Sequence, residues 1–275
     1  MNYYEMLGMN KEPFSTSPDP HFFYASKEHK AALMKAIIEV RLKRGLSVIM
    51  GNVGMGKTTL CRKLLQMFRE RENIDIYMIL DPDYRTEKLF FGALIKTFSI
   101  EITKSRPNTL DYKEALKNFL FKKAVEQGRT VVLLIDEAQK MTLSSLEILR
   151  MLLNYETNEY KLLQLLLVGQ TELRVQLKQM RNFVDRISFK CVLNPISDLN
   201  ELRELINFRV EKAGYAGEEK LFDPGAIREI YQYTQGYPRR LAMLCHNALR
   251  ELVICEQKIV TSEIIRETIA QEVLI

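Results

Sequence analysis

The sequence predicts an α/β fold in which helices cover a parallel sheet, followed by a small all-helical domain. Short, almost wholly apolar segments alternate with segments of helical period, a pattern typical of parallel strands buried on both faces. The glycine-rich run "GNVGMGKTTL" stands between one such apolar segment and a helical one. After "FKCVLNPIS", residues 189–197, the strand pattern fades and only helical spacing continues.

We therefore expect three parts: an arm of residues 1–26, a core of residues 27–194 and a helical domain of residues 195–275. The arm holds three prolines, which forbid a continuous helix. Its aromatic side chains must be buried, so we expect it to lie across the domain that follows. The first helix of the core should begin after Ser26, a helix N-cap, and end at Gly45.

The other elements of the core alternate along the chain. Leucine-rich and β-branched runs bounded by turn residues favour strands, and apolar residues three and four apart favour helices. The expected strands are residues 46–50, 74–80, 130–137, 162–170 and 187–193. The expected helices are residues 58–72, 86–98, 110–128 and 145–156.

The run from Gly51 to Thr58 fits the pattern G-x-x-x-x-G-K-[ST], and its strand–loop–helix context is that of a phosphate-binding loop. Backbone N–H groups and the helix N-terminus attract phosphate. Lys57 would reach the β- and γ-phosphates, and Thr58 would offer its hydroxyl to Mg²⁺. A purely structural turn needs no Lys-Thr pair, so we predict binding of ATP with Mg²⁺. The residues expected at the nucleotide are Gly51, Asn52, Val53, Gly54, Met55, Gly56, Lys57, Thr58 and Thr59.

A pair of acids ends the apolar run "TVVLLIDE", at the strand edge where α/β sheets bind ligands. Asp136 would hold Mg²⁺ through water or through Thr58. Glu137 would orient and polarise the attacking water. Paired acids also occur in ordinary turns after strands, but these follow a phosphate-binding loop by about 80 residues.

Two further polar residues are candidates for the same site. Gln170 closes the strand "LLLVGQ", where its amide would contact the γ-phosphate or the water; the alternative is a turn residue. Arg239 follows Pro238 in the first turn of a helix, where a positive charge opposes the helix dipole. A phosphate partner explains that position, and a surface salt bridge is the alternative.

An arginine that stabilises the transition state can come from a neighbouring subunit. Arg181 and Arg186 precede the last strand, and neither is placed to reach the chain's own glycine loop. We favour Arg186 because it borders the strand and is more rigidly held. Surface charge is the alternative for both.

The bulk composition excludes some classes of protein. No apolar run approaches 18 residues and no signal sequence is present, so we expect a cytoplasmic protein without a membrane span. Residues 195–275 carry ten Lys and Arg against thirteen Asp and Glu, so residues 1–194 hold a net charge of +8 within a total of +5. A basic core suits an anionic partner, although an ordinary lysine-rich surface has the same composition.

These residues together resemble an AAA+ ATPase. More narrowly, "EPFSTSPDPHFFYASKEHKAAL", "LLIDEAQKM" and "AGYAGEEKLFDPGAI" resemble the ExeA/GspA group, and TnsC-type transposition regulators are similar in architecture. The resemblance implies a helical lid domain, ATP-driven homo-oligomerisation into a ring or helical filament, and a site shared between subunits. In family terms Gly51–Thr58 match Walker A, Asp136 and Glu137 match Walker B, Gln170 matches sensor 1, Arg186 matches the arginine finger and Arg239 matches sensor 2.

The chain departs from the ExeA pattern at its end, "AQEVLI", where a membrane helix and a peptidoglycan-binding domain usually follow. We therefore expect a stand-alone ATPase that assembles on double-stranded DNA and regulates a transposase or target-selection protein. The alternative is an ATPase that drives assembly of a secretion or pilus machine. A metabolic P-loop kinase fits the helical domain with "GYPRR" poorly.

Two loops of the core are candidates for DNA contact. One carries Lys104 and Arg106, and the other carries Lys140 and Thr142. In AAA+ rings the loops after the second strand and after Walker B commonly line the pore, where cations would follow a phosphate backbone without reading bases. A solvated surface is the alternative. In the arm, Tyr24 is the first choice for an aromatic that covers the adenine, and simple packing of the arm is the alternative.

Overall fold

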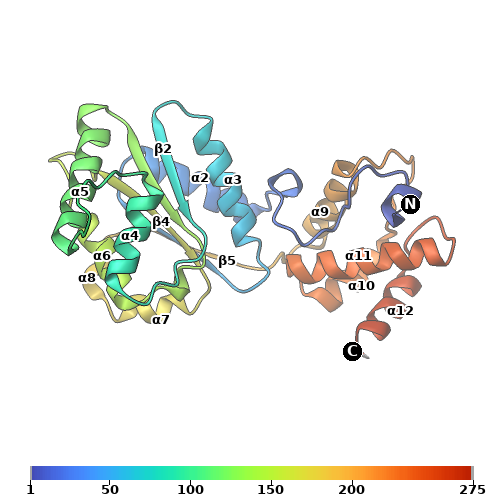
Figure 1. Cartoon of the computed structure of the whole chain (residues 1–275). Helices are drawn as coiled ribbons and strands as arrows, with labels where there is room; N and C mark the ends of the chain where they lie inside the picture. Colours follow the sequence, from blue (N-terminus) through green and yellow to red (C-terminus); the bar gives the residue numbers. More distant parts are fainter. Residues whose placement is uncertain (1, 274–275) are drawn as a thin grey trace. The chain divides into compact units, whose positions relative to one another are not determined.

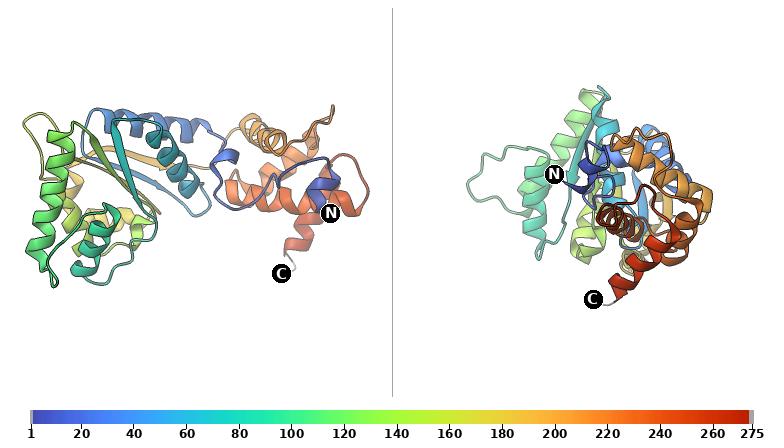
Figure 2. Two further views of the ribbon diagram at one scale, coloured as in Figure 1. Left: turned by 45° about the horizontal axis from the view of Figure 1, so that its top comes forward. Right: turned by 90° about the vertical axis from the view of Figure 1, so that its right-hand side faces the viewer.

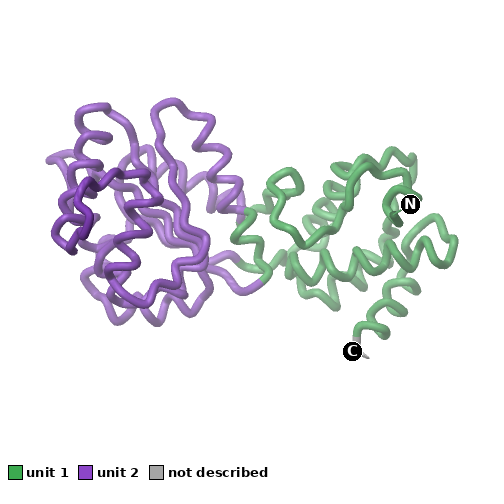
Figure 3. The backbone as a smooth tube through the Cα atoms, in the orientation of Figure 1, with its two compact units in different colours: residues 1–28, 54–59, 194–275 green, residues 29–53, 60–193 purple. Residues whose placement is uncertain are grey.

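The computed structural model describes residues 2–273, which divide into two compact units (Figures 1 and 3). The sheet unit comprises residues 29–53 and 60–193. The helical unit comprises, within the described residues, the N-terminal segment to residue 28, residues 54–59 and the segment from residue 194 onward. The tip of the glycine loop is thus grouped with the helical unit, although both of its flanks belong to the sheet unit.

All five expected strands are present, and every pairing between them is parallel, which confirms the predicted α/β fold. Their order across the sheet is β2-β3-β4-β1-β5. The three central strands are buried over their whole length, as their continuous apolar sequences require. The strands are β1 (Leu46–Gly51), β2 (Ile74–Ile79), β3 (Thr130–Ile135), β4 (Leu163–Gly169) and β5 (Ile187–Leu193).

Helices cover both faces of this sheet (Figure 2). Alternate side chains such as Val131, Leu133 and Ile135 join one continuous core with residues of α4 to α8, while their neighbours in β3 point to the face of α2 and α3. Each fully buried leucine contributes about 1.5–3 kcal/mol. The helices are α2 (Lys27–Arg41), α3 (Lys57–Arg69), α4 (Glu87–Thr97), α5 (Thr109–Phe121), α6 (Leu143–Leu152), α7 (Leu173–Lys178) and α8 (Arg181–Val184).

Several predicted helices end earlier in the structure, and two of them differ for a clear reason. The helix after Ser26 stops at Arg41, because Lys43 takes a left-handed conformation (φ 52°) before Gly45. The single helix expected over residues 110–128 is α5 followed by a turn of π-helix, Lys122–Glu126. Apolar spacing does not report such changes of hydrogen-bond pattern.

The helical unit has its own apolar core, and the N-terminal arm is part of it. Phe14 packs edge-on against Phe222 with ring centroids 5.9 Å apart, and Arg209 lies over the rings of Phe14 and Phe22. Our expectation that the arm lies across the sheet domain is therefore wrong, because its aromatic side chains are buried in the helical core. The helices are α1 (Tyr3–Met6), α9 (Leu199–Lys212), α10 (Pro224–Thr234), α11 (Pro238–Ile254) and α12 (Ser262–Val273). Over residues 2–273, no helix combines the length and apolarity needed to cross a membrane.

Candidate nucleotide site

The topology brings three predicted segments to one edge of the sheet. In a parallel sheet all carboxyl ends lie on the same side, and β4 is the neighbour of both β1 and β3. Met50 of β1 is in register with Gly169 of β4, and Ile135 of β3 is in register with Leu167. The glycine loop, the acidic pair and Gln170 therefore follow three adjacent strands.

The glycine loop joins β1 to the N-terminus of α3. Gly54 and Gly56 adopt left-handed conformations (φ 81° and 77°), which glycine takes without strain. Lys57, the first residue of α3, is only 5% exposed, which is unusual for lysine. Because the first N–H groups of a helix lack partners within the helix, a loop followed by a helix start is an arrangement that can bind an anion. A hydrogen bond from Thr171 Oγ1 to Asn52 Oδ1 (3.3 Å) joins the start of the loop to the segment after β4.

Arg239 lies directly against the glycine loop within the helical unit. Its backbone N–H donates to the carbonyl oxygen of Gly54 (3.1 Å). A Cβ on Gly54 would stand 2.8 Å from the Cβ of Arg239, so this approach also requires glycine. Over residues 2–273 no carboxylate forms an ion pair with Arg239, whereas the neighbouring Arg240 lies over the ring of Tyr237. The exposed guanidinium of Arg239 thus starts from a backbone that is fixed to the loop.

The acidic pair combines a buried carboxylate with a strained backbone. Asp136 is 1% exposed, and its Oδ1 accepts a hydrogen bond from the backbone N–H of Glu137 (2.9 Å). Glu137 itself is left-handed (φ 52°, ψ 35°), a conformation that is costly for a residue with a Cβ and that concentrates at functional sites. The short helix Ala138–Lys140 begins immediately after it.

Two glutamine amides contact the Glu137 carboxylate. Gln170 Nε2 lies 3.4 Å from Glu137 Oε2, as expected if Gln170 acts in the same site. Gln139 Nε2 donates to the same oxygen at 2.6 Å, and Gln139 Oε1 accepts from the backbone N–H of Gln170 (2.9 Å). Sequence reasoning missed Gln139. One of its partners, Gln170, follows another strand, so no local pattern marks it.

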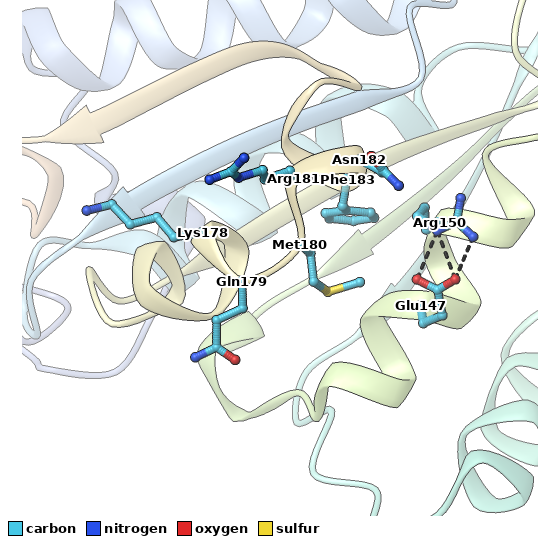
Figure 4. Close-up of a pocket in the computed structure, with 8 residues that line it drawn as sticks. All are labelled: Glu147, Arg150, Lys178, Gln179, Met180, Arg181, Asn182 and Phe183. Carbon is cyan, nitrogen blue, oxygen red and sulfur yellow. Dashed lines mark hydrogen bonds and ion pairs between the residues drawn. The ribbon is translucent and has the colours of Figure 1, made fainter.

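Arg186 belongs to the opposite edge of the sheet. Arg186 immediately precedes the amino end of β5, and parallel strands place that end away from the carboxyl edge. Arg181 begins α8 and lines a surface pocket of about 430 Å³ together with the Glu147–Arg150 ion pair (Figure 4). The Arg150 guanidinium holds the pKa of Glu147 below its usual range, with a smaller effect from Arg186.

The four residues proposed for DNA contact differ in the partners they already have within the chain. Lys104 donates to both carboxylate oxygens of Asp111 (2.9 and 2.8 Å), and Lys140 donates to Asp81 (3.1 Å). Thr142 is the N-cap of α6, where its hydroxyl accepts from the backbone N–H of Ser145. Arg106 is exposed in the loop before α5. Both lysines would have to exchange a carboxylate for a phosphate before they bind DNA.

Tyr24, the candidate for the adenine contact, is attached to α9. Its hydroxyl donates to Glu204 Oε2 (2.9 Å), and its ring packs edge-on against Phe208 with centroids 5.6 Å apart. Burial and the Glu204 carboxylate raise the pKa of Tyr24. These contacts hold the ring in the helical unit, as simple packing of the arm also requires.

Comparison with known proteins links this site to a family. A family model described as "AAA domain" matches residues 40–177. General secretion pathway protein A of Aeromonas hydrophila is 33% identical over 249 residues, which are 90% of this chain and 44% of that protein. The chain thus spans less than half the length of this relative.

Solved structures share the fold at low sequence identity. The Aeropyrum pernix ORC2 protein, in its ADPNP-ADP complexes, matches with a TM-score of 0.64 at 15% identity, over 95% of this chain and 71% of that one. Drosophila ORC bound to DNA matches with a TM-score of 0.67 at 18% identity, over 99% of this chain and 66% of that one.

Proposed function

The chain belongs to the AAA family of P-loop ATPases, with an ExeA/GspA-like sequence, and from that premise we propose that it binds ATP with Mg²⁺ and hydrolyses it to ADP and phosphate. The observation that carries the proposal is the carboxyl edge of the sheet. There the glycine loop, the Asp136–Glu137 pair and Gln170 follow three adjacent strands, and Gln170 contacts Glu137.

The donor set fits the nucleotide and its metal. The Thr58 hydroxyl and the buried Asp136 carboxylate are the hard oxygen ligands that Mg²⁺ prefers. Mg²⁺, when bound, would neutralise the charge that develops on the phosphates. The loop amides and Lys57 would bind the phosphates. Arg239, whose backbone N–H is bonded to Gly54, would sense whether the phosphates are bound.

Hydrolysis requires a water held for in-line attack. Glu137 would orient that water and accept its proton, and the Gln170 amide would hold the water or the γ-phosphate. Arg186 precedes the amino end of β5, so we assign it to the nucleotide of a neighbouring copy in a ring or helical filament. An arginine of this kind contributes about 10³–10⁵ in rate, so the isolated chain should hydrolyse ATP slowly.

Nucleotide binding and phosphate release test this proposal directly. The wild-type protein should bind a fluorescent ATP analogue in the presence of Mg²⁺, and phosphate release per chain should rise with protein concentration as the shared site assembles. Lys57→Ala should abolish binding. Wild-type protein that binds no nucleotide, or a Lys57→Ala variant that binds it normally, would refute the assignment of the glycine loop.

For the pathway, we propose that the chain is an ATPase that acts from the cytoplasm and drives assembly of a secretion machine. This reverses the order of our sequence expectations, because the 33%-identical relative carries a secretion-pathway name. Regulation of a transposase on double-stranded DNA is the second candidate. It is supported by the basic composition of residues 1–194 and by the DNA-bound ORC structure of the same fold, but Lys104 and Lys140 are paired within the chain.

One experiment separates the two pathways. Gel filtration of the protein with ATP at low salt, with and without duplex DNA, would show a DNA-dependent assembly if the second candidate is correct. Assembly with ATP that ignores duplex DNA would support the secretion role.

A further inference from the structure

We propose that Gln139 is a positioning residue for ATP hydrolysis, holding the Glu137 carboxylate so that one of its oxygens is presented to water. The inference deepens the proposed ATPase function and rests on it. Gln139 was not among the residues that the sequence marked, and it is placed by hydrogen bonds with Glu137, Gln170 and Gln176 of the sheet unit.

Both polar atoms of the Gln139 side-chain amide form hydrogen bonds. Its Nε2 donates to Glu137 Oε2 at 2.6 Å, the shorter of the two amide contacts to this carboxylate. Its Oε1 accepts from the backbone N–H of Gln170 at 2.9 Å. The amide therefore joins the proposed catalytic acid after β3 to the backbone that follows β4.

The backbone of Gln139 is held as well. Gln176 Nε2, on α7, donates to the carbonyl oxygen of Gln139 at 2.8 Å. The other polar atom of the Gln176 side chain, Oε1, is buried and has no hydrogen-bond partner among the described residues. The described hydrogen bond of this side chain is therefore the one to Gln139. A side chain that is hydrogen-bonded at its backbone and at both polar atoms is restricted to few rotamers.

Gly169 makes room for this arrangement. A Cβ built on Gly169 would stand 2.9 Å from Gln139 Oε1 and 3.2 Å from its backbone nitrogen. Such distances require the neighbour to move, so any larger residue at the end of β4 would displace the Gln139 amide. Glycine here is explained by the close approach, because its φ is not in the left-handed region.

The geometry has a direct consequence for Glu137. Gln139 and Gln170 both donate to Oε2, which leaves Oε1 as the oxygen to face water. Glu137 also has a left-handed backbone, so the direction of its side chain is set by these amides on a strained segment. A misplaced base costs about 10- to 100-fold in rate, even where substrate binding is unchanged.

The test is Gln139→Glu, which keeps the size of the side chain and the acceptor for the Gln170 N–H but replaces the N–H donor by a second carboxylate. We expect kcat to fall about 10- to 100-fold while KM and ATP-analogue affinity stay within about twofold. Gly169→Ala should also lower kcat, because the added Cβ would displace the Gln139 amide without changing Gln139 itself. Gln232→Glu, the same change at an exposed position of α10, should leave kcat and KM unchanged.

A second readout does not depend on activity. In protein labelled with ¹³C at the glutamate carboxyl carbon, the Glu137 resonance is assigned by its loss in Glu137→Gln. It should move in a Gln139→Met variant and stay in Gln232→Met. An unmoved resonance, a wild-type kcat in Gln139→Glu, or a raised KM at unchanged kcat would each overturn the proposal and leave the ATPase function intact. Wild-type protein without ATPase activity would refute the proposed function, and the resonance alone would then decide the role of Gln139.

Discussion

Two carboxylates at opposite edges of the same sheet have opposite surroundings. At the amino edge, Asp75 of β2 is bonded to the Arg129 guanidinium and to Lys123. These cations, led by the Arg129 hydrogen bond and opposed by burial, hold the pKa of Asp75 below its usual range. At the carboxyl edge, the described hydrogen bonds to the Glu137 carboxylate come from two neutral amides, those of Gln139 and Gln170.

The difference fits a structural role for Asp75 and the catalytic role proposed for Glu137. A carboxylate between two cations is stabilised as an anion and has little tendency to accept a proton. A carboxylate oriented by amides keeps its direction and its ability to act as a base. The four predictions below test this contrast, from the largest expected effect to the smallest.

The largest effect should come from Glu137→Gln. The variant keeps the size of the side chain but removes the base, so kcat should fall by about 10⁴-fold while ATP still binds. The ATP-bound assembly should persist, as gel filtration would show. Hydrolysis at the wild-type rate would remove Glu137 from its assigned role.

Arg186→Ala should lower phosphate release by about 10³-fold at saturating protein, because it withdraws the charge that stabilises the transition state of a neighbouring copy. Affinity for ATP should change little. The sharper measurement is a mixture with Lys57→Ala, since each variant retains what the other lacks and part of the activity should return. If no mixing ratio restores activity, the site is not shared between copies.

Asp75→Asn should affect stability and leave catalysis alone. The folded pKa of Asp75 is lowered, so its contribution to stability is fully present above the unfolded value of about 3.9 and is lost as the pH falls through the folded pKa. The variant should lose about 1–3 kcal/mol of unfolding free energy at pH 7. The deficit should shrink towards acid pH. Urea unfolding at pH 7 and at roughly pH 2, well below the unfolded pKa, measures it, and an equal deficit at both values would exclude the ion pair as the cause.

The smallest effect is expected for Lys104→Ala combined with Lys140→Ala. Both lysines already have carboxylate partners, so their loss should weaken duplex DNA binding modestly and equally across sequences, and reduce its salt slope by roughly 2. ATP binding should survive. Fluorescence anisotropy over a salt series checks both points, and unchanged affinity with an unchanged slope would exclude these loops from a DNA interface.

Much of this molecule follows from local patterns. The five strands and the glycine loop were predicted because apolar period and glycine spacing act over a few residues. The proximity of Gln170 to Glu137 also followed, since carboxyl ends of parallel strands share an edge. The arm was misplaced, because aromatic residues such as Phe14 show that a segment must be buried without showing which core will receive it.

The sequence by itself determined the α/β class, the family and the main residues of the proposed nucleotide site, since each lies in a short continuous segment. Only the tertiary structure decided which side chains meet across segments. It placed Gln139 between Glu137 and Gln170, set Arg239 against Gly54, and gave Lys140 a carboxylate partner. The physical reason is that these contacts depend on distances between atoms far apart along the chain, which hydrophobic period and motif spacing do not encode.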